Sequence, residues 1–157
     1  MRIRRAEAAD AALLDRALRQ LSGDLGDPHR AGLADLRRAG FGASPVFLAM
    51  LAEKDGVLGG AVLASPLFST TRGGAGLYVS DLWVAAEGRG QRLGARLLAA
   101  ARDEGARLWQ ARFLRLPVYR DNARAMAFYQ RLGFRVLEEE RMVVLEGAAL
   151  GRFGDDG

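Results

Sequence analysis

The stretch at residues 87–98, "EGRGQRLGARLL", decides how the rest of the chain is interpreted. It places Gly88, Gly90 and Gly94 among arginines and then becomes apolar without a break. Glycine adopts backbone conformations that other residues resist, and the leucines and alanines that follow recur at helical spacing. The stretch therefore predicts a tight turn that leads directly into an amphipathic helix starting near Leu93.

A glycine-rich turn before a helix is a site that suits phosphate. The first amides of a helix have no partner within it, and the helix dipole adds positive charge at that end. Glycines let an anion approach the backbone, and Arg89 and Arg92 add cations. A tight loop without a ligand is the alternative. A P-loop is excluded because no Gly-Lys pair occurs, and a dinucleotide fingerprint is excluded by the glycine spacing and the mid-chain position.

Length and composition indicate one compact domain. The chain has 157 residues, of which 50% are hydrophobic, enough for a sizeable core. We expect a single domain over 1–146 and a flexible tail over 147–157. No apolar run approaches the roughly 20 residues of a membrane span, and the charged start lacks a signal-peptide core. A cytoplasmic location is the expectation.

Cysteine and histidine content excludes several chemistries. The chain has no cysteine and a single histidine, His29. Disulfides, thiolate metal sites and a cysteine nucleophile are therefore excluded, and no metal site is expected. No G-x-S-x-G elbow accompanies His29, which excludes a serine triad of that kind. Because a single histidine on a loop is usually a surface residue, we expect this side chain to be exposed. The net charge of +4 is too small and scattered to indicate nucleic-acid binding.

The order of predicted elements indicates a mixed α/β sheet. Apolar spacing predicts a strand at 3–6, helices at 8–21 and 29–40, and a hairpin at 45–68 around Asp55-Gly56. A strand at 77–84 follows, whose alternation slips at Asp81-Leu82 and indicates a bulge or splay. After the helix at 93 come a strand at 111–118, a helix at 121–134 and two short strands at 135–147. Asp10 is the expected N-cap of the first helix.

Two signatures in this order resemble the GNAT superfamily of acyl-CoA N-acyltransferases. The first is Arg or Gln, two residues, Gly, one residue, then Gly or Ala, and it is matched by Arg89 through Gly94, "RGQRLG". Arg92 stands where the family usually has its middle glycine, so its side chain must point away from a pyrophosphate or lie along it. The second, "VYRDNARAMAFYQRLGF", supplies Asn122 and Tyr129. The resemblance extends over residues 77–137.

The resemblance implies a fold and a cofactor. The fold is a mixed, mostly antiparallel sheet of about six to seven strands, with helices on both faces and a splay between the central strands. The cofactor is acetyl-CoA, with the pyrophosphate on backbone amides of the turn and the pantetheine arm along the splayed strand. The implied cofactor-binding residues are Leu82, Trp83, Val84, Arg89, Gly90, Gln91, Arg92, Leu93, Gly94, Ala95, Asn122 and Tyr129.

Acyl transfer to an amine needs a base and an acid. An alkylamine has a pKa near ~10.4 and must lose a proton before it attacks. Asp81 is the candidate base, with Glu53 and Asp24 as weaker alternatives; a polar residue at a bulge is the structural alternative for Asp81. Tyr129 is the candidate acid for the departing thiolate, since the resemblance favours that role over a core aromatic.

The acceptor is left open by the sequence. The resemblance places acceptor contacts near 21–40 and 138–150, where acidic residues are consistent with a polyamine-like amine; aminoglycosides, amino acids and peptides remain alternatives. A non-catalytic acyl-CoA-binding module is the alternative function, and a structural domain without a ligand is the third. The resemblance also favours a homodimer, whereas the charge distribution and the lack of a long apolar run predict no nucleic-acid or membrane partner.

Overall fold

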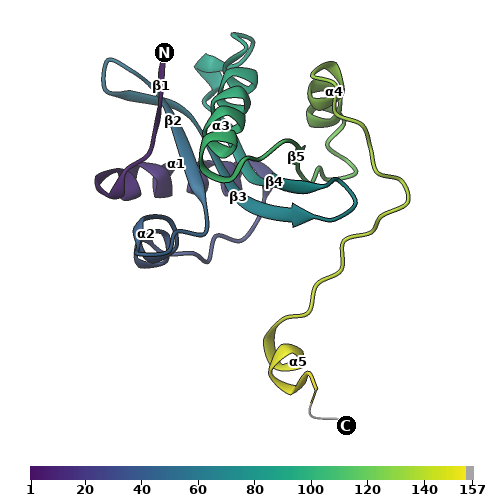
Figure 1. Cartoon of the computed structure of the whole chain (residues 1–157). Helices are drawn as coiled ribbons and strands as arrows, with labels where there is room; N and C mark the ends of the chain where they lie inside the picture. Colours follow the sequence, from purple (N-terminus) through teal and green to yellow (C-terminus); the bar gives the residue numbers. More distant parts are fainter. Residues whose placement is uncertain (155–157) are drawn as a thin grey trace. The chain divides into compact units, whose positions relative to one another are not determined.

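The structure is a computed structural model that describes residues 1–154 (Figure 1). Its contacts divide the chain into two units, Met1–Tyr119 and Arg120–Gly157. The first unit contains β1 (Arg2–Arg5), the 3-10 turn η1 (Ala8–Asp10), α1 (Ala11–Leu25), α2 (Leu33–Phe41), β2 (Leu48–Lys54), β3 (Val57–Ser69), β4 (Gly74–Val84), η2 (Ala86–Gly88), α3 (Leu93–Trp109) and β5 (Leu114–Arg115). The second contains α4 (Ala123–Arg131) and α5 (Gly147–Arg152). No helix in residues 1–154 is long and apolar enough to cross a bilayer.

The sheet confirms the predicted mixed, mostly antiparallel class. Its strands lie in the order β1-β2-β3-β4-β5, with every pair antiparallel except the parallel pair β4 and β5. The hairpin between β2 and β3 turns at Asp55 and Gly56, whose φ angles of 53° and 76° are the left-handed values of a tight two-residue turn. The described residues form five strands rather than the six or seven implied.

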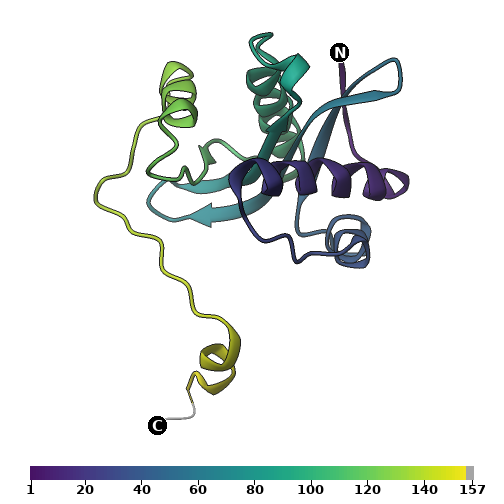
Figure 2. The same ribbon diagram turned by 180° about the vertical axis from the view of Figure 1, so that it is seen from behind.

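Helices cover both faces of the sheet in the first unit (Figures 1 and 2). On one face, Leu14 and Leu18 of α1 join Leu36 of α2 in a buried cluster over β2 and β3. On the other face, α3 packs across β2, β3 and β4. Its buried residues recur at the predicted helical spacing: Leu93, Gly94, Leu97, Leu98, Ala101 and Gly105. The helix that follows the glycine-rich turn is therefore fixed by the sheet core.

The end of the first helix differs from the prediction. The helix continues through "SGDL" to Leu25 and ends where Gly26 adopts a left-handed φ of 74°. The hydroxyl of Ser22 donates to the carbonyl of Leu18 at 3.0 Å, which lets this turn-forming residue remain inside the helix. Asp10 does not cap α1 with its side chain; its carboxylate instead accepts the amide of Glu7 at 2.8 Å.

The strands expected late in the chain are short or missing. The strand expected at 111–118 is reduced to β5, which has only two residues. Pro117 follows shortly after β5, and a proline has no backbone N–H to donate to a neighbouring strand. The two strands expected at 135–147 do not form: this segment has no ladder in the described residues, and it turns at 138–139 within three consecutive glutamates. Residues 147–152 of the expected tail form α5, and 155–157 lie outside the described residues.

Candidate active site

A bulge in β4 sets which face each site residue occupies. Leu63 of β3 pairs with Asp81, whereas the next residue, Ala64, pairs with Val79, so Ser80 is an extra residue. Side chains directly opposite each other in a sheet share a face, and Leu63 belongs to the cluster under α1. The bulge therefore directs Asp81 towards the α1 face, as expected of bulges that re-aim side chains at functional sites.

The two sides of the bulge contact different layers. Before it, Leu77 packs under α3, where it approaches Gly105. After it, Trp83 packs against the cluster under α1. This confirms the predicted break in alternation and explains it, because one inserted residue exchanges the two faces of the strand.

Asp81 is a half-buried carboxyl group at this bulge. Burial raises its pKa above the usual value, while the hydroxyl of Ser80, which donates to Oδ2 at 2.6 Å, and attraction by His29 lower it. The two weaker candidates are held in ion pairs. Glu53 binds Arg4 at 2.9 Å, and Asp24 binds Arg89 at 2.9 Å. Of the three carboxylates, Asp81 has the environment of a tuned base.

β4 also has an open edge beside Asp81. β3 pairs with β4 along its whole length, but β5 pairs with it only at Leu77 and Tyr78. From Val79 to Val84 the other edge has no neighbouring strand within the described chain. An extended ligand can hydrogen-bond such an edge as an added strand does. The separation of β4 from β5 after Tyr78 corresponds to the splay between central strands that the sequence indicated.

The open edge is followed by the short η2 and then by the glycine-rich turn. Residues 89–92 are exposed, so the turn is not covered by side chains. The first bond of α3 joins the amide of Arg96 to the carbonyl of Arg92 at 3.1 Å, so the amides of residues 93–95 have no helical acceptor. Gly90 has a left-handed φ of 79°. The turn has the open amides and conformational freedom that a pyrophosphate site requires.

Arg92 occupies the position where the family usually has a glycine. It is the N-cap of α3 and adopts left-handed φ and ψ of 58° and 15°. A left-handed conformation costs a residue with a Cβ roughly 1–2 kcal/mol, which is the physical reason why glycine suits this position. The side chain is exposed, so it does not fill the turn.

This strain predicts a difference between two substitutions of Arg92. Arg92→Gly and Arg92→Ala both remove the guanidinium, but only glycine relieves the backbone. We expect the glycine variant to have a free energy of unfolding about 1 kcal/mol higher than that of the alanine variant, measured by urea denaturation. Equal stabilities would show that Arg92 is not strained in solution.

Arg89 links the turn to α1 and β4. Its Nε donates to the carbonyl of Val84 at 3.1 Å, and its guanidinium binds Asp24 near the end of α1. Gln91 donates to the carbonyl of Glu87 at 3.0 Å. The side chains of the signature therefore brace the turn from outside and leave its amides accessible.

Asn122 and Tyr129 belong to the second unit, Asn122 just before α4 and Tyr129 within it. The prediction that Asn122 is an N-cap is confirmed: Oδ1 accepts the amide of Ala125 at 3.1 Å. The ring of Tyr129 makes edge contacts with Phe128 and Phe134, at centroid distances of 5.1 and 5.5 Å. Burial raises the pKa of the Tyr129 hydroxyl above its ordinary value, which already lies well above neutral pH.

Sequence reasoning missed a polar cluster around His29. The side chain expected to be exposed is only 15% exposed; its Nδ1 lies 3.0 Å from Ser22 Oγ, and its Nε2 lies 3.5 Å from Asp15 Oδ1. Asp15 and Ser22 are seven residues apart and so share one side of α1. Two polar residues on one side of α1, next to its apolar stripe, were the sequence signal that could have predicted a polar contact there.

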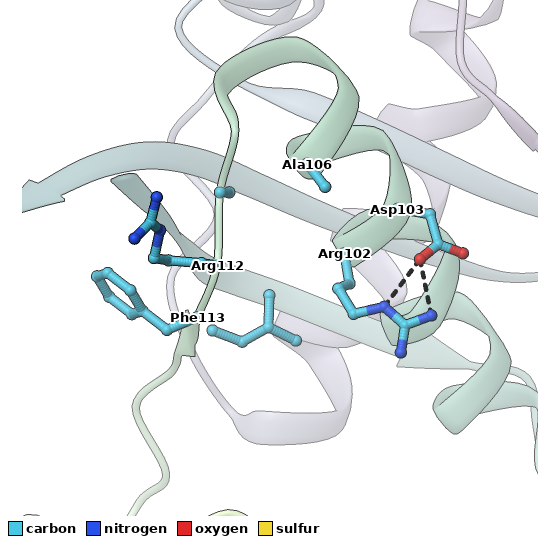
Figure 3. A pocket seen from close by; sticks show the side chains of 7 residues that line it. Arg102, Asp103, Ala106, Arg112 and Phe113 are labelled. Atoms are coloured by element: carbon cyan, nitrogen blue, oxygen red, sulfur yellow. Dashed lines mark hydrogen bonds and ion pairs between the residues drawn. The ribbon is translucent and has the colours of Figure 1, made fainter. Parts of the chain in front are cut away.

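Hollows in the described part of the first unit include one beside the candidate site and one apart from it. One, of about 470 Å³, adjoins the candidate site through Trp83, Ala85 and Glu87 and reaches α1 and the β2–β3 turn. The other, of about 220 Å³, lies between α3 and β5; Arg102 at its rim is paired with Asp103 (Figure 3). Its α3 residues start nine positions after Leu93, about 14 Å along the helix, so it is separate from the turn.

The comparisons identify the family to which this fold belongs. The model of the acetyltransferase (GNAT) family matches residues 13–134. This is most of the chain, and the protein belongs to the GNAT family of acetyltransferases.

Solved structures share the fold at low sequence identity. The aminoglycoside N-acetyltransferase AAC(6')-Iy in complex with CoA is 21% identical, with a TM-score of 0.76 and 94% of each chain covered. A Vibrio cholerae integron cassette protein is 20% identical, with a TM-score of 0.76, covering 96% of this chain and 95% of its own. The ribosomal-protein-alanine N-acetyltransferase from Brucella melitensis is 17% identical, with a TM-score of 0.72, covering 93% and 100%.

Proposed function

We propose that the protein transfers an acetyl group from acetyl-CoA to a primary amine of a small molecule, polyamine-like or other, or of a peptide, by direct attack in a ternary complex. One observation carries the proposal. On β4, the bulge directs the Asp81 carboxyl to the α1 face, and the same strand continues as an open edge into the turn at 89–92. A base and a cofactor-binding edge thus lie on one short segment.

The residues of this segment fit the cofactor. The amides of residues 93–95 and the left-handed Gly90 form the place for the pyrophosphate, and the β4 edge from Leu82 to Val84 is the place for the pantetheine arm. Acetyl-CoA supplies the activated thioester. Asn122 and Tyr129, assigned by the second signature, complete the proposed contacts.

Three groups carry out the proposed chemistry. Asp81 accepts the proton of the substrate ammonium, directly or through water, so that the nitrogen lone pair can form the new C–N bond. Backbone amides near Val84 stabilise the negative charge on the carbonyl oxygen. As the C–S bond breaks, the Tyr129 hydroxyl gives its proton to the sulfur, and the second proton that the nitrogen loses restores the hydroxyl, directly or through water. A tyrosine is protonated at neutral pH, and burial raises the pKa of this hydroxyl further.

Binding of acetyl-CoA can be tested before any acceptor is known. At 100 times its Kd, acetyl-CoA is expected to add about 2.7 kcal/mol to the free energy of unfolding, measured by thermal denaturation. Gly90→Ala should abolish this gain, because a methyl group enters the turn and strains it.

Gly73 provides a matched control. Its φ of 72° resembles the 79° of Gly90, and neither position has atoms within 4 Å of an added Cβ. Gly73→Ala therefore causes similar backbone strain far from the turn and should keep the full response. The absence of a response in the unmodified protein would contradict the proposed cofactor.

We also propose that the protein works as a homodimer. In the C-terminal segment, Met142, Val143 and Val144 are 75%, 88% and 79% exposed. A contiguous apolar run in water is unfavourable, and a symmetric second copy can cover it. Light scattering after size-exclusion chromatography should give twice 16.9 kDa, and Val143→Asp with Val144→Asp should give the monomer mass. A monomeric unmodified protein would contradict this.

A further inference from the structure

The side chain of Arg89 bonds to the end of β4 and to the end of α1. Its Nε donates to the carbonyl of Val84 at 3.1 Å, and its Nη2 binds Oδ2 of Asp24 at 2.9 Å. Val84 is the last residue of β4, and Asp24 lies in the last turn of α1. The two charged side chains are 43% and 46% exposed. A ligand that arrives from solvent can therefore compete for either partner of the guanidinium.

The strand ladder shows on which edge the Val84 carbonyl lies. The amide of Ala85 donates to the carbonyl of Gly59 at 2.9 Å, so the polar groups of Ala85 face β3. In an antiparallel pair, residues that bond to the neighbouring strand alternate with residues whose N–H and C=O point away from it. Val84 directly precedes Ala85, so its N–H and C=O point to the open edge of β4. Arg89 therefore occupies an acceptor of that edge.

A pantetheine arm on this edge needs the same carbonyl. The arm carries amide N–H groups, which can bond to the open edge as an added strand does. The alternation places the carbonyls of Leu82 and Val84 on the open edge after the bulge. Arg89 holds one of these two. A pantetheine arm by itself must therefore displace Arg89 and has no anion to bind the released guanidinium.

Coenzyme A differs from the bare arm because it carries a diphosphate. Arg89 belongs to the same turn as the amides of residues 93–95, which have no helical acceptor. A guanidinium that leaves Val84 thus remains beside an anion bound at those amides. Hydrogen bonds from a guanidinium to phosphate are charge-assisted and stronger than a bond to a neutral carbonyl. The diphosphate therefore compensates for the loss of both contacts of Arg89.

We propose that Arg89 is a specificity-determining residue that selects CoA thioesters over shorter pantetheine thioesters. The side chain disfavours a bare arm by holding the Val84 carbonyl and favours CoA by binding the diphosphate. Specificity commonly combines a contact against the wrong ligand with a contact for the right one. Asp24 takes part by anchoring the guanidinium to α1. This inference rests on the proposed function, in which the pantetheine arm lies along β4.

Arg89→Ala should change the affinities for the two ligands in opposite directions. It frees the Val84 carbonyl, so S-acetylpantetheine should bind about threefold more tightly, the effect of losing an exposed ion pair. It also removes the cation for the diphosphate, so acetyl-CoA should bind about tenfold more weakly. Titration of ¹⁵N-labelled protein followed by NMR measures the first ligand, and calorimetry the second. Weaker binding of both ligands would mean that Arg89 only braces the turn and would overturn the proposal.

Asp24→Asn loosens the guanidinium without removing it. This variant should bind S-acetylpantetheine about threefold more tightly and should also bind acetyl-CoA more tightly. S-acetylpantetheine has no charge, so a change in the field of the protein does not explain its gain. Asp103→Asn is the matched control, because it breaks an exposed pair with Arg102 in the second half of α3 and should leave both affinities unchanged. Unchanged binding of S-acetylpantetheine in Asp24→Asn would overturn the proposal, including where Arg89→Ala does not fold.

The outcomes distinguish this inference from the proposed function. If the affinities shift as stated but no amine releases thiol from acetyl-CoA, the acetyl transfer fails while the selection by Arg89 stands. If amines are acetylated and Arg89→Ala weakens both ligands, only the inference about Arg89 fails. If the unmodified chain does not bind acetyl-CoA, both fail.

Discussion

Asp81→Asn is expected to lower kcat for amine acetylation by roughly two to four orders of magnitude at neutral pH, the usual contribution of a positioned base. Asparagine has the same shape, and its carbonyl can still accept the hydrogen bond that Ser80 donates at 2.6 Å. Stability and acetyl-CoA binding should therefore change little. The measurement is thiol release from acetyl-CoA with a panel of polyamines, amino acids, aminoglycosides and peptides.

Glu53→Gln is the matched control for this substitution. Glu53 was the alternative base, and the structure pairs it with Arg4 instead. Removing the charge of Glu53 weakens only a partly exposed ion pair, and such pairs contribute little. We therefore expect Glu53→Gln to change kcat less than about threefold. If Asp81→Asn turned over at the unmodified rate while Glu53→Gln did not, the base would have been assigned to the wrong carboxylate.

Tyr129→Phe is expected to lower kcat by roughly 10²-fold or more while acetyl-CoA binding is retained. Phenylalanine preserves the edge contacts with Phe128 and Phe134, so the helix should fold as before. The proton for the departing sulfur must then come from water. Single-turnover kinetics at saturating acetyl-CoA measure the effect.

Tyr119→Phe removes a hydroxyl from a comparable ring without touching the proposed acid. The Tyr119 hydroxyl donates to the carboxylate of Asp27 at 2.9 Å, and its loss should affect stability more than rate. An unchanged rate in Tyr129→Phe would remove Tyr129 from the mechanism. Cofactor binding by the unmodified protein with no thiol release from any amine would instead favour the non-catalytic acyl-CoA-binding module.

Local signals predicted much of the fold. Asp55-Gly56 defined the hairpin because only left-handed residues fit its turn, and both adopt that conformation. The apolar spacing after Leu93 defined α3, and Asn122 caps α4 as expected. These features depend on a few neighbouring residues, which a sequence displays directly.

Features that depend on distant partners were less accessible. The break in alternation at Asp81-Leu82 was visible, but the face it gives Asp81 depends on the register with Leu63. His29 was expected to be exposed because its loop reads as polar; its burial depends on where that loop returns across α1. The closing strands at 135–147 were predicted from the local sequence pattern, yet a strand also needs a neighbouring edge.

Ser80 makes β4 two half-strands that are out of phase by one residue. Leu77 and Asp81 are four residues apart, so in a regular strand they would share a face, whereas the extra residue lets Leu77 lie beneath α3 while Asp81 faces α1. A deletion of Ser80 would join Val79 to Asp81 opposite Ala64 and Leu63, which are already neighbours, and would leave both faces as they are. The deletion would instead remove the local twist that a bulge adds, and with it the present course of the open edge.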